Sequence, residues 1–504
     1  MKLSALIPLI SLSAPTLTLA LSDASSSSHQ SPRLTRRTTH LSSRAPSDDV
    51  LDINNFLSTN YKNGDLPPGH QSGDASGQVV VLTNGGGADD DSQSPQCSST
   101  IFIGGADVQG SFSTGWKALP QITGFDLLRD VSVASGGIVQ PYYQLRGRDP
   151  SQVKRLIISQ PGLPRDTWKY VNLIRNAMLC AVSNSSNNIN LSEIMIAAPA
   201  WLNTDDASAG AAEANDVVFS NGNWNLGSQS SGPASTSVSS YQVMDTLLTA
   251  LLSRFPNVNQ VWIAGHSLGA SFVQRYALVK KPDNSDAVLN FWAGNAGSYA
   301  WPIKDRPIQP SGSCASTYDD WAYGLSSGPV YRQADVQANV SAVQQQYYGR
   351  RVVVALGTAD DGAGDSACEA QFEGSTHLER GSNLQSAMKT LPGGIPARHA
   401  FDFVQGVAHE DYLMFSSPAA LQHLFVENFN TKGTSSGAGT TSASPSSTKS
   451  GGGSKPTTSN NSGGGGNTGT GGSGDNKGSG VRLTGLAFTG VSLIAVLCGS
   501  MLLL

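Results

Sequence analysis

The chain has 504 residues, a formal net charge of −5 and an isoelectric point near 5.9. This balance leaves no basic field of the kind that binds nucleic acid. Composition changes sharply near residues 95 and 431, so we expect one large folded domain between them.

The first 20 residues have the pattern of a secretory signal peptide. Met1 and Lys2 precede a mostly apolar stretch, and small residues at Thr18 and Ala20 suit a cleavage site. Residues 21–95 are rich in Ser, Asp, Gly and Asn and form a low-complexity arm with no chemistry of its own. The pair Arg36-Arg37 is either a dibasic site that would release a propeptide or a chance pair.

Residues 96–431 alternate between strand-like and helix-like patterns. Apolar runs predict strands at 156–158, 194–198, 261–264, 288–293, 352–356 and 401–404, and helical patterns predict helices at 168–182, 241–255, 270–278 and 421–429. Such alternation favours an α/β fold with a mostly parallel sheet and helices on both faces. Sites in these folds form beyond the carboxyl ends of the strands.

The most informative stretch is Gly-His-Ser-Leu-Gly at 265–269, between a predicted strand and a predicted helix. In that setting the pattern G-x-S-x-G predicts a nucleophile elbow, a sharp turn that exposes the serine at the end of the sheet. Ser267 is therefore the candidate nucleophile. The alternative is an ordinary turn in which Ser267 caps the helix.

A serine hydroxyl needs a base, and the base needs an acid that fixes its tautomer. Folds built around this elbow place them in the order serine, acid, histidine. The candidates for the base are thus the histidines after the serine, His377, His399, His409 and His423. We expect His409, because it follows the last predicted strand in a loop. His423 lies inside a predicted helix, His399 precedes its strand, and His377 opens a helical segment where a solvated or structural role is expected.

The acid should follow the strand predicted at 352–356, where Asp360 is the first carboxylate. Asp361 and Asp365 are rivals, and all three could be turn residues. The developing oxyanion needs two backbone donors. We expect the amides of Leu268, directly after the serine, and of Leu163, after Gln160-Pro161-Gly162. A plain Pro-Gly turn is the alternative for that second loop.

The C-terminal region has a different composition. Residues 432–480 are a Gly/Ser/Thr-rich stalk. Residues 481–504 end in an apolar stretch that no basic segment follows. This arrangement is typical of a GPI-attachment signal and predicts a location at the extracellular face of the plasma membrane or in the cell wall. A membrane span at the end of the chain is the alternative.

Cysteines and sequons fit a secreted protein. Apart from Cys498 in the tail, four cysteines remain, which allow two disulfides in three connectivities: Cys97, Cys180, Cys314 and Cys368. Within the domain, Asn184, Asn190 and Asn339 begin N-x-S/T sequons and are candidate glycosylation sites; Asn460 begins one in the stalk.

The chain resembles the α/β-hydrolase superfamily, and more narrowly little-characterised secreted α/β-hydrolases of fungi and bacteria. The resemblance lies in segments 160–163, 265–269, 357–360 and 406–409, with further similarity at 318–325 and 377–381. Many relatives begin the oxyanion loop with His-Gly, whereas this chain has Gln160-Pro161-Gly162. The superfamily usually carries a cap insertion where this chain has residues 301–348, whose aromatic side chains could line a pocket or form a small core.

The resemblance implies a lipase-like or esterase-like serine hydrolase that acts on carboxylic esters without cofactor or metal. The substrate could be a small molecule, a lipid or a wall-polymer ester. Two alternatives stay open: a catalytically inactive binding protein on the same scaffold, and a serine peptidase or acyltransferase that shares the three side chains.

Overall fold

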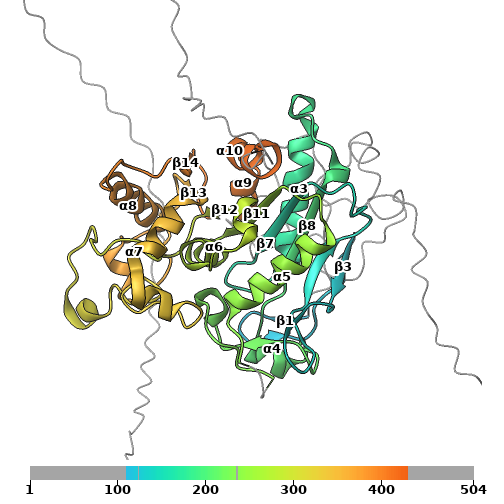
Figure 1. The fold of residues 1–504 in the computed structure, drawn as a ribbon, viewed down its shortest axis with the longest axis horizontal. Helices are drawn as coiled ribbons and strands as arrows, with labels where there is room; N and C mark the ends of the chain where they lie inside the picture. Colours follow the sequence, from blue (N-terminus) through green and yellow to red (C-terminus); the bar gives the residue numbers. More distant parts are fainter. Residues whose placement is uncertain (1–108, 123, 234–236, 429–504) are drawn as a thin grey trace, which may run out of the picture. The chain divides into compact units, whose positions relative to one another are not determined.

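The structure is a computed structural model that describes residues 109–122, 124–233 and 237–428 (Figure 1). The predicted signal peptide, the whole N-terminal arm, the stalk and the GPI-attachment signal lie outside these residues, as do residues 96–108. Cys97, Cys498 and Asn460 also lie outside them. None of the helices described combines the length and hydrophobicity that a membrane crossing requires.

An eight-stranded sheet forms the centre of the described part of the chain. Its order is β14 (His399–Val404), β13 (Arg351–Gly357), β12 (Leu289–Gly294), β11 (Gln260–His266), β7 (Arg155–Gln160), β8 (Ile194–Pro199), β6 (Tyr142–Leu145) and β3 (Phe125–Leu128). Strand β6 is antiparallel to both of its neighbours, and all other pairs are parallel. The central strands are continuous buried apolar runs because helices cover both faces.

Short strands pair outside this sheet. They are β1 (Gly110–Ser111) with β2 (Gly115–Trp116), β4 (Ser132–Ala134) with β5 (Ile138–Val139), and β9 (Leu202–Asn203) with β10 (Val218–Phe219). The eight helices of the described residues are α3 (Thr167–Ser183), α4 (Thr204–Ala209), α5 (Ser240–Arg254), α6 (Leu268–Val279), α7 (Gln333–Gly349), α8 (His377–Lys389), α9 (Asp411–Phe415) and α10 (Pro418–Leu421).

Two neighbouring residues of β12 show that helices cover both faces. Phe291 packs against Tyr276 of α6, whereas Trp292 packs against Phe415 of α9. Successive side chains of a strand point to opposite faces, so α6 and α9 lie on opposite sides of the sheet. Helix α3 lies beside α9 (Figure 1). Tyr170 of α3 packs edge-on against Phe415 of α9. The predicted α/β architecture is thus confirmed.

The predicted strands are all present; five are one to three residues longer than predicted, and the one predicted at 288–293 is shifted by one residue, to Leu289–Gly294. The predicted closing helix at 421–429 is wrong in its bounds: α10 begins at Pro418, and a π-helical turn, Gln422–Val426, follows it. The helix starts earlier because the Ser417 hydroxyl caps it, accepting from the amide of Ala420, and because proline suits the first helical turn.

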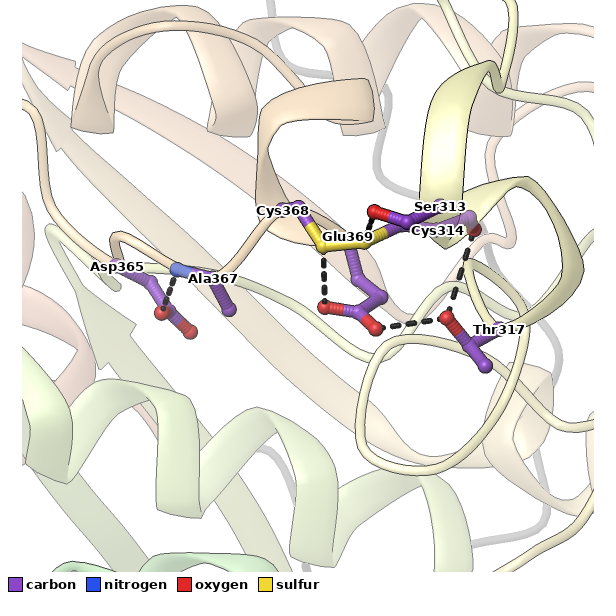
Figure 2. The surroundings of a disulfide bond; sticks show 7 residues. All are labelled: Ser313, Cys314, Thr317, Asp365, Ala367, Cys368 and Glu369. Carbon is purple, nitrogen blue, oxygen red and sulfur yellow. Dashed lines mark hydrogen bonds between the residues drawn. A yellow bond between two sulfur atoms is a disulfide. The ribbon is translucent and has the colours of Figure 1, made fainter. Parts of the chain in front are cut away.

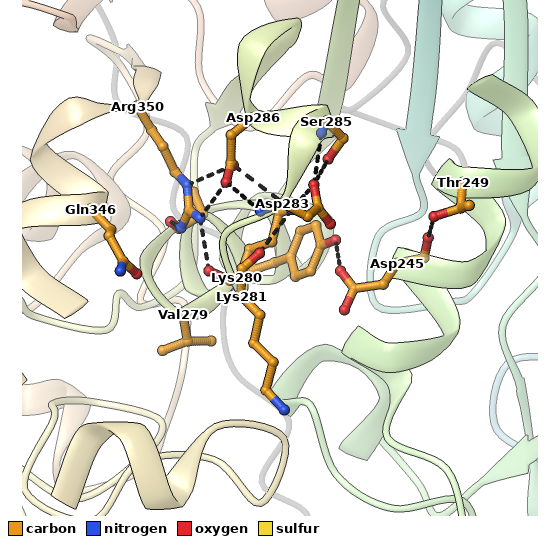
Figure 3. A network of polar contacts seen from close by, with 12 residues as sticks. Asp245, Thr249, Val279, Lys280, Lys281, Asp283, Ser285, Asp286, Gln346 and Arg350 are labelled. Atoms are coloured by element: carbon orange, nitrogen blue, oxygen red, sulfur yellow. Dashed lines mark hydrogen bonds and ion pairs between the residues drawn. The ribbon is translucent and has the colours of Figure 1, made fainter. Parts of the chain in front are cut away.

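A polar network fixes the far end of α6, the helix that begins at the elbow (Figure 3). The buried Lys280 ammonium lies 3.0 Å from Asp283 and 3.7 Å from Asp286. The Arg350 guanidinium contacts Asp286 and donates to the carbonyls of Ala277 and Lys280, both at 2.7 Å. Cationic groups at a helix C-terminus satisfy its free carbonyls and its dipole, so this cluster holds α6 in place behind the site.

Candidate active site

Ser267 occupies a strained turn between β11 and α6. Its backbone has φ 58° and ψ −123°, a conformation that costs a non-glycine residue about 1–3 kcal/mol. Its side chain makes no capping hydrogen bond, so the alternative role as an ordinary helix cap does not hold. A Cβ on Gly269 would lie 2.6 Å from the carbonyl oxygen of Pro161, so only glycine lets that loop approach the turn.

The structure brings Ser267, His409 and Asp360 into one hydrogen-bonded series. Nε2 of His409 lies 3.0 Å from Oγ of Ser267, and Nδ1 of the same ring lies 2.7 Å from Oδ2 of Asp360. Ser267 follows β11, Asp360 follows β13, and His409 follows β14, so three strands deliver the three groups to one edge of the sheet. A carboxylate can only accept, so Nδ1 of His409 carries the proton and Nε2 is free to accept from the serine.

Asp360 stays ionised at this site. Burial by itself would raise the pKa of this carboxyl, but contacts with His377 and His409 outweigh burial and hold the pKa well below its usual range. His266 also lies beside His409, with ring centroids 4.6 Å apart. Burial, and to a smaller extent the neighbouring His409 imidazole, lowers the pKa of His266 well below its ordinary value, so His266 remains neutral.

Four of the rival candidates have other surroundings or partners. Asp361 is exposed, and Asp365 instead accepts hydrogen bonds from Ser298 at 2.7 Å and from Tyr323 at 3.0 Å. His399, at the first position of β14, lies 3.0 Å from the carbonyl oxygen of Tyr347. His423 contacts Asp402 and Glu427.

His377, which the sequence predicted to be solvated or structural, is not solvated. It is buried, with its Nδ1 atom 3.0 Å from Oδ1 of Asp360, and its ring stacks on that of His409. Its position at the start of a helix gave no signal of this, because the contact depends on how α8 packs against the loop after β13.

Asn295 is a second residue that sequence reasoning missed. It follows β12 with φ 49° and links the ends of three strands. Its side-chain nitrogen donates to the carbonyl of Ala408 at 2.8 Å, and its oxygen accepts from the amide of Gly357 at 2.7 Å. Asn295 thereby ties the loop that carries His409 to the strand that leads to Asp360. A single asparagine after a strand is too common to be singled out without coordinates.

A pocket of about 590 Å³ opens in front of the serine. Ser267, Leu268, Leu163, His377 and His409 all line it, so both predicted oxyanion donors belong to residues at the same opening. Its polar lining residues include Asn221, Asn223, Asn225, Ser271, Arg275, Ser298, Tyr323, Asp365 and Ser366. The volume is in the range of small-molecule sites.

The aromatic side chains of segment 301–348 pack in several different ways. Tyr323 lines the pocket. Trp301 and Tyr318 flank the Arg306 guanidinium, and Tyr347 packs against His399. Most of α7 lies in this segment and packs beside α6, so the segment contributes to the helical layer on that face.

The sheet order and the strained serine directly after the central strand β11 decide the fold. The chain has the α/β-hydrolase fold. Its antiparallel strand, β6, is second from one edge of the sheet, and Ser267 follows the central parallel strand β11. Asp360 follows β13 and His409 follows β14, which lie two and three strands from β11 in the sheet order. The resemblance inferred from the sequence is confirmed at the level of this fold.

No protein-family model matches this α/β-hydrolase-fold chain, and no curated protein matches it significantly. Solved structures similar to it include poly(aspartic acid) hydrolase-1 from Sphingomonas sp. KT-1, at 17% identity and a TM-score of 0.40, covering 64% of this chain and 98% of that one. A poly(3-hydroxybutyrate) depolymerase from Bordetella parapertussis is also 17% identical, with a TM-score of 0.40 and coverage of 59% and 89%.

A feruloyl esterase module from Clostridium thermocellum is 11% identical, with a TM-score of 0.35 and coverage of 62% of this chain and 91% of that module. These hydrolases are distant from this chain in sequence. The assignment of the α/β-hydrolase fold therefore rests on the sheet order and the elbow of this chain itself.

Two other groups of predicted residues can be placed on this α/β-hydrolase domain. Cys314 and Cys368 form a disulfide between the segment after β12 and the segment after β13 (Figure 2). The sequon residues Asn184, Asn190 and Asn339 are all exposed, as glycan attachment requires.

Proposed function

We propose that this protein is a serine hydrolase that cleaves carboxylic esters. The observation that carries the proposal is the continuous series from Ser267 through His409 to Asp360, with separations of 3.0 and 2.7 Å, at the opening of a pocket. The positive φ of Ser267 supports it, because a strained backbone of this kind persists where the side chain is needed.

In the proposed reaction, Oγ of Ser267 attacks the ester carbonyl while Nε2 of His409 takes its proton. The Asp360 carboxylate stabilises the imidazolium that forms. The amides of Leu163 and Leu268 donate to the oxyanion, each worth about 3 kcal/mol of barrier in comparable sites. His409 then returns the proton to the leaving alcohol, and water, activated by the same ring, releases the acyl group from the serine.

The pocket favours esters with compact or polar groups over those with long alkyl chains. Polar side chains line much of it, among them Arg275, Ser298, Tyr323 and Asp365. Burying an extended alkyl chain against the half-buried Asp365 carboxylate would remove solvent from a charged group, which costs free energy. We therefore expect kcat/KM for p-nitrophenyl esters to be highest at short acyl chains, with anilide analogues of the same acids turned over poorly.

The test is the turnover of p-nitrophenyl acetate by the wild type, Ser267→Ala and the matched control Ser386→Ala, an exposed serine on α8. Ser267→Ala should lose essentially all turnover and all labelling by a fluorophosphonate probe, whereas Ser386→Ala should keep both. Wild-type turnover that survives in Ser267→Ala would exclude this serine as the nucleophile. A folded wild type without turnover or labelling would support a binding protein on the same scaffold instead.

We also propose that the enzyme is secreted and held at the cell surface by a GPI anchor. The support is the composition of residues 1–20 and 432–504, which lie outside the described residues. Treatment of intact cells with phosphatidylinositol-specific phospholipase C should release the protein into the medium. Retention on the cells after this treatment would favour a membrane span at the C-terminus.

A further inference from the structure

His377 is a buried imidazole at the site for which the proposed reaction has no role. It is 7% exposed, lines the same pocket as Ser267, and occupies the first position of α8. Its Nδ1 atom lies 3.0 Å from Oδ1 of Asp360, whereas Nδ1 of His409 lies 2.7 Å from Oδ2. Each imidazole therefore faces one oxygen of the carboxylate, and the amide of Gly362 also donates to Oδ1, at 3.3 Å.

The main chain fixes His377 relative to Asp360. The amide of His377 donates to the carbonyl of Gly362 at 2.9 Å, and the amide of Leu378 donates to the carbonyl of Asp360 at 3.2 Å. A Cβ on Gly362 would lie 3.0 Å from Nδ1 of His377, and one on Gly364 would lie 3.1 Å from Nε2. The loop thus wraps the ring so closely that it leaves no room for a side chain at either glycine.

The segment between Asp360 and His377 is also tied at its middle. Cys368 is bonded to Cys314, and the neighbouring Glu369 carboxylate accepts from Thr317 at 2.8 Å (Figure 2). Asp365 accepts from the amide of Ala367 at 3.0 Å within the same segment. These links limit the movement of the loop that carries both the acid and the second imidazole.

The ring of His377 stacks on that of His409, and the ring of His266 lies beside His409 at a tilt. His377 and His409 lie with centroids 4.2 Å apart and planes 27° from parallel, while His266 contacts His409 with centroids 4.6 Å apart. His409 itself is about a third exposed and sits in a loop, so contacts from its neighbours decide where its Nε2 atom points. The ring of His377 covers the face of His409 and opposes its rotation away from Ser267.

We propose that His377 is a positioning residue of the Ser267–His409–Asp360 site: its Nδ1 atom, 3.0 Å from Oδ1 of Asp360, holds the carboxylate for His409 together with the amide of Gly362, and its ring supports that of His409. This inference rests on the proposed function. A carboxylate with a donor on each oxygen cannot turn about its terminal bond without breaking a contact. Small misplacements of catalytic groups lower rates by as much as about 100-fold, so such an anchor has a kinetic effect.

The test compares kcat and KM of the full chain for p-nitrophenyl acetate in the wild type, His377→Phe and His377→Asn. Phe keeps a ring for the stack but has no donor, whereas Asn keeps an N–H near the position of Nδ1. We expect His377→Phe to lower kcat about 10- to 100-fold with KM nearly unchanged, since the contact of Nδ1 with the charged Asp360 carboxylate is lost. His377→Asn should restore most of kcat. His423→Asn, a histidine away from the site, is the matched control and should keep the wild-type kcat.

An active wild type with an equally active His377→Phe variant would overturn the inference, as would an Asn variant as impaired as Phe. If the variants do not fold, a measurement on the wild type still tests the inference. Nitrogen NMR of the imidazoles at neutral pH should show a proton on Nδ1 of His377, and a ring protonated only at Nε2 would also overturn the inference. Failure of the proposed function is distinguishable, because it appears as an inactive wild type that takes no fluorophosphonate.

Discussion

At the scale of single residues, the site depends on side chains whose conformations the surrounding chain imposes. Ser267 has a positive φ that serine rarely adopts, and Asp360 is almost fully buried while ionised. Both states cost free energy in isolation. The hydrogen bonds from Ser267 to His409 and from His409 to Asp360 require both of them, so the strain and the buried charge point to the same function.

Asp360→Asn tests the role of the acid. An amide at this position can present its N–H₂ group to Nδ1 of His409, which favours the tautomer that cannot accept from Ser267. Comparable substitutions lower kcat by about 10⁴-fold with the fold intact, and we expect a loss of about 10³- to 10⁴-fold here. Steady-state kinetics with p-nitrophenyl acetate measures it.

Asp361→Asn is the matched control, because Asp361 is the exposed neighbour on the same loop. It should keep the wild-type kcat. If Asp361→Asn were the impaired variant and Asp360→Asn the active one, the assignment of the acid would be wrong.

At the scale of elements, close contact between the elbow and the loop after β7 determines the oxyanion site. Gly269, on the first turn of α6, lies against the carbonyls of Gln160 and Pro161. These residues lead directly to Leu163, the proposed donor. The position of that amide is therefore set by how closely a helix and a loop can approach each other.

Gly269→Ala should separate these two elements. The added Cβ would lie 2.6 Å from the oxygen of Pro161 and 2.7 Å from that of Gln160, so the backbone must move. Loss of one oxyanion donor typically costs about 10²- to 10³-fold in kcat, and we expect a fall of about 100-fold. In contrast, Gly349→Ala places its Cβ in open space and should leave kcat unchanged. Equal kinetics of the two variants would exclude this account of the loop.

The disulfide connects two further elements. Cys314 and Cys368 are 54 residues apart in the sequence, and their bond restricts the unfolded chain. Replacing both by serine should lower the free energy of unfolding by about 2–4 kcal/mol. Urea unfolding of the oxidised wild type and the double variant measures the difference. A wild type whose stability is unaffected by a reducing agent would contradict this stabilising role of the disulfide.

At the scale of the whole molecule, a buried carboxyl couples stability to pH. Burial raises the pKa of Glu373 to about 8, although its side chain accepts from the amide of Tyr299 at 2.9 Å. Between pH 4.5 and 8 the folded protein keeps this proton and the unfolded chain releases it, so this group makes stability fall as pH rises. Burial lowers the pKa of His399 to about 4, so this group makes stability rise with pH, but only below pH 6.5.

Glu373→Gln removes the alkaline part of this dependence. The amide oxygen still accepts from Tyr299, but there is no proton to lose. We expect the free energy of unfolding of the variant, relative to wild type, to increase steadily from pH 6.5 to 8.5 in urea titrations. Glu213→Gln, which alters an exposed glutamate, should follow the wild type at every pH. A constant difference between Glu373→Gln and wild type would show that Glu373 does not titrate in this range.

Much of the fold was predictable because its signals are local. The strands are continuous apolar runs, and the elbow requires glycines around a serine within five residues. Element bounds were less predictable, as α10 shows: a serine cap and a proline outweighed the apolar pattern that suggested a later start. His377 was a candidate base, but its contact with Asp360 was not predictable, and Asn295 was not predictable as part of the site, because these contacts depend on how separate elements pack.

The sequence by itself determined an α/β architecture and a short set of candidates, since strand patterns and the G-x-S-x-G turn depend on neighbouring residues only. The tertiary structure decided which carboxylate and which histidine meet the serine. Strands β13 and β14 are adjacent in the sheet, and the loops after them bring Asp360 and His409 together across 49 residues of sequence. It also placed His377 beside the second oxygen of that carboxylate, because helix packing rather than sequence spacing sets which side chains share a buried charge.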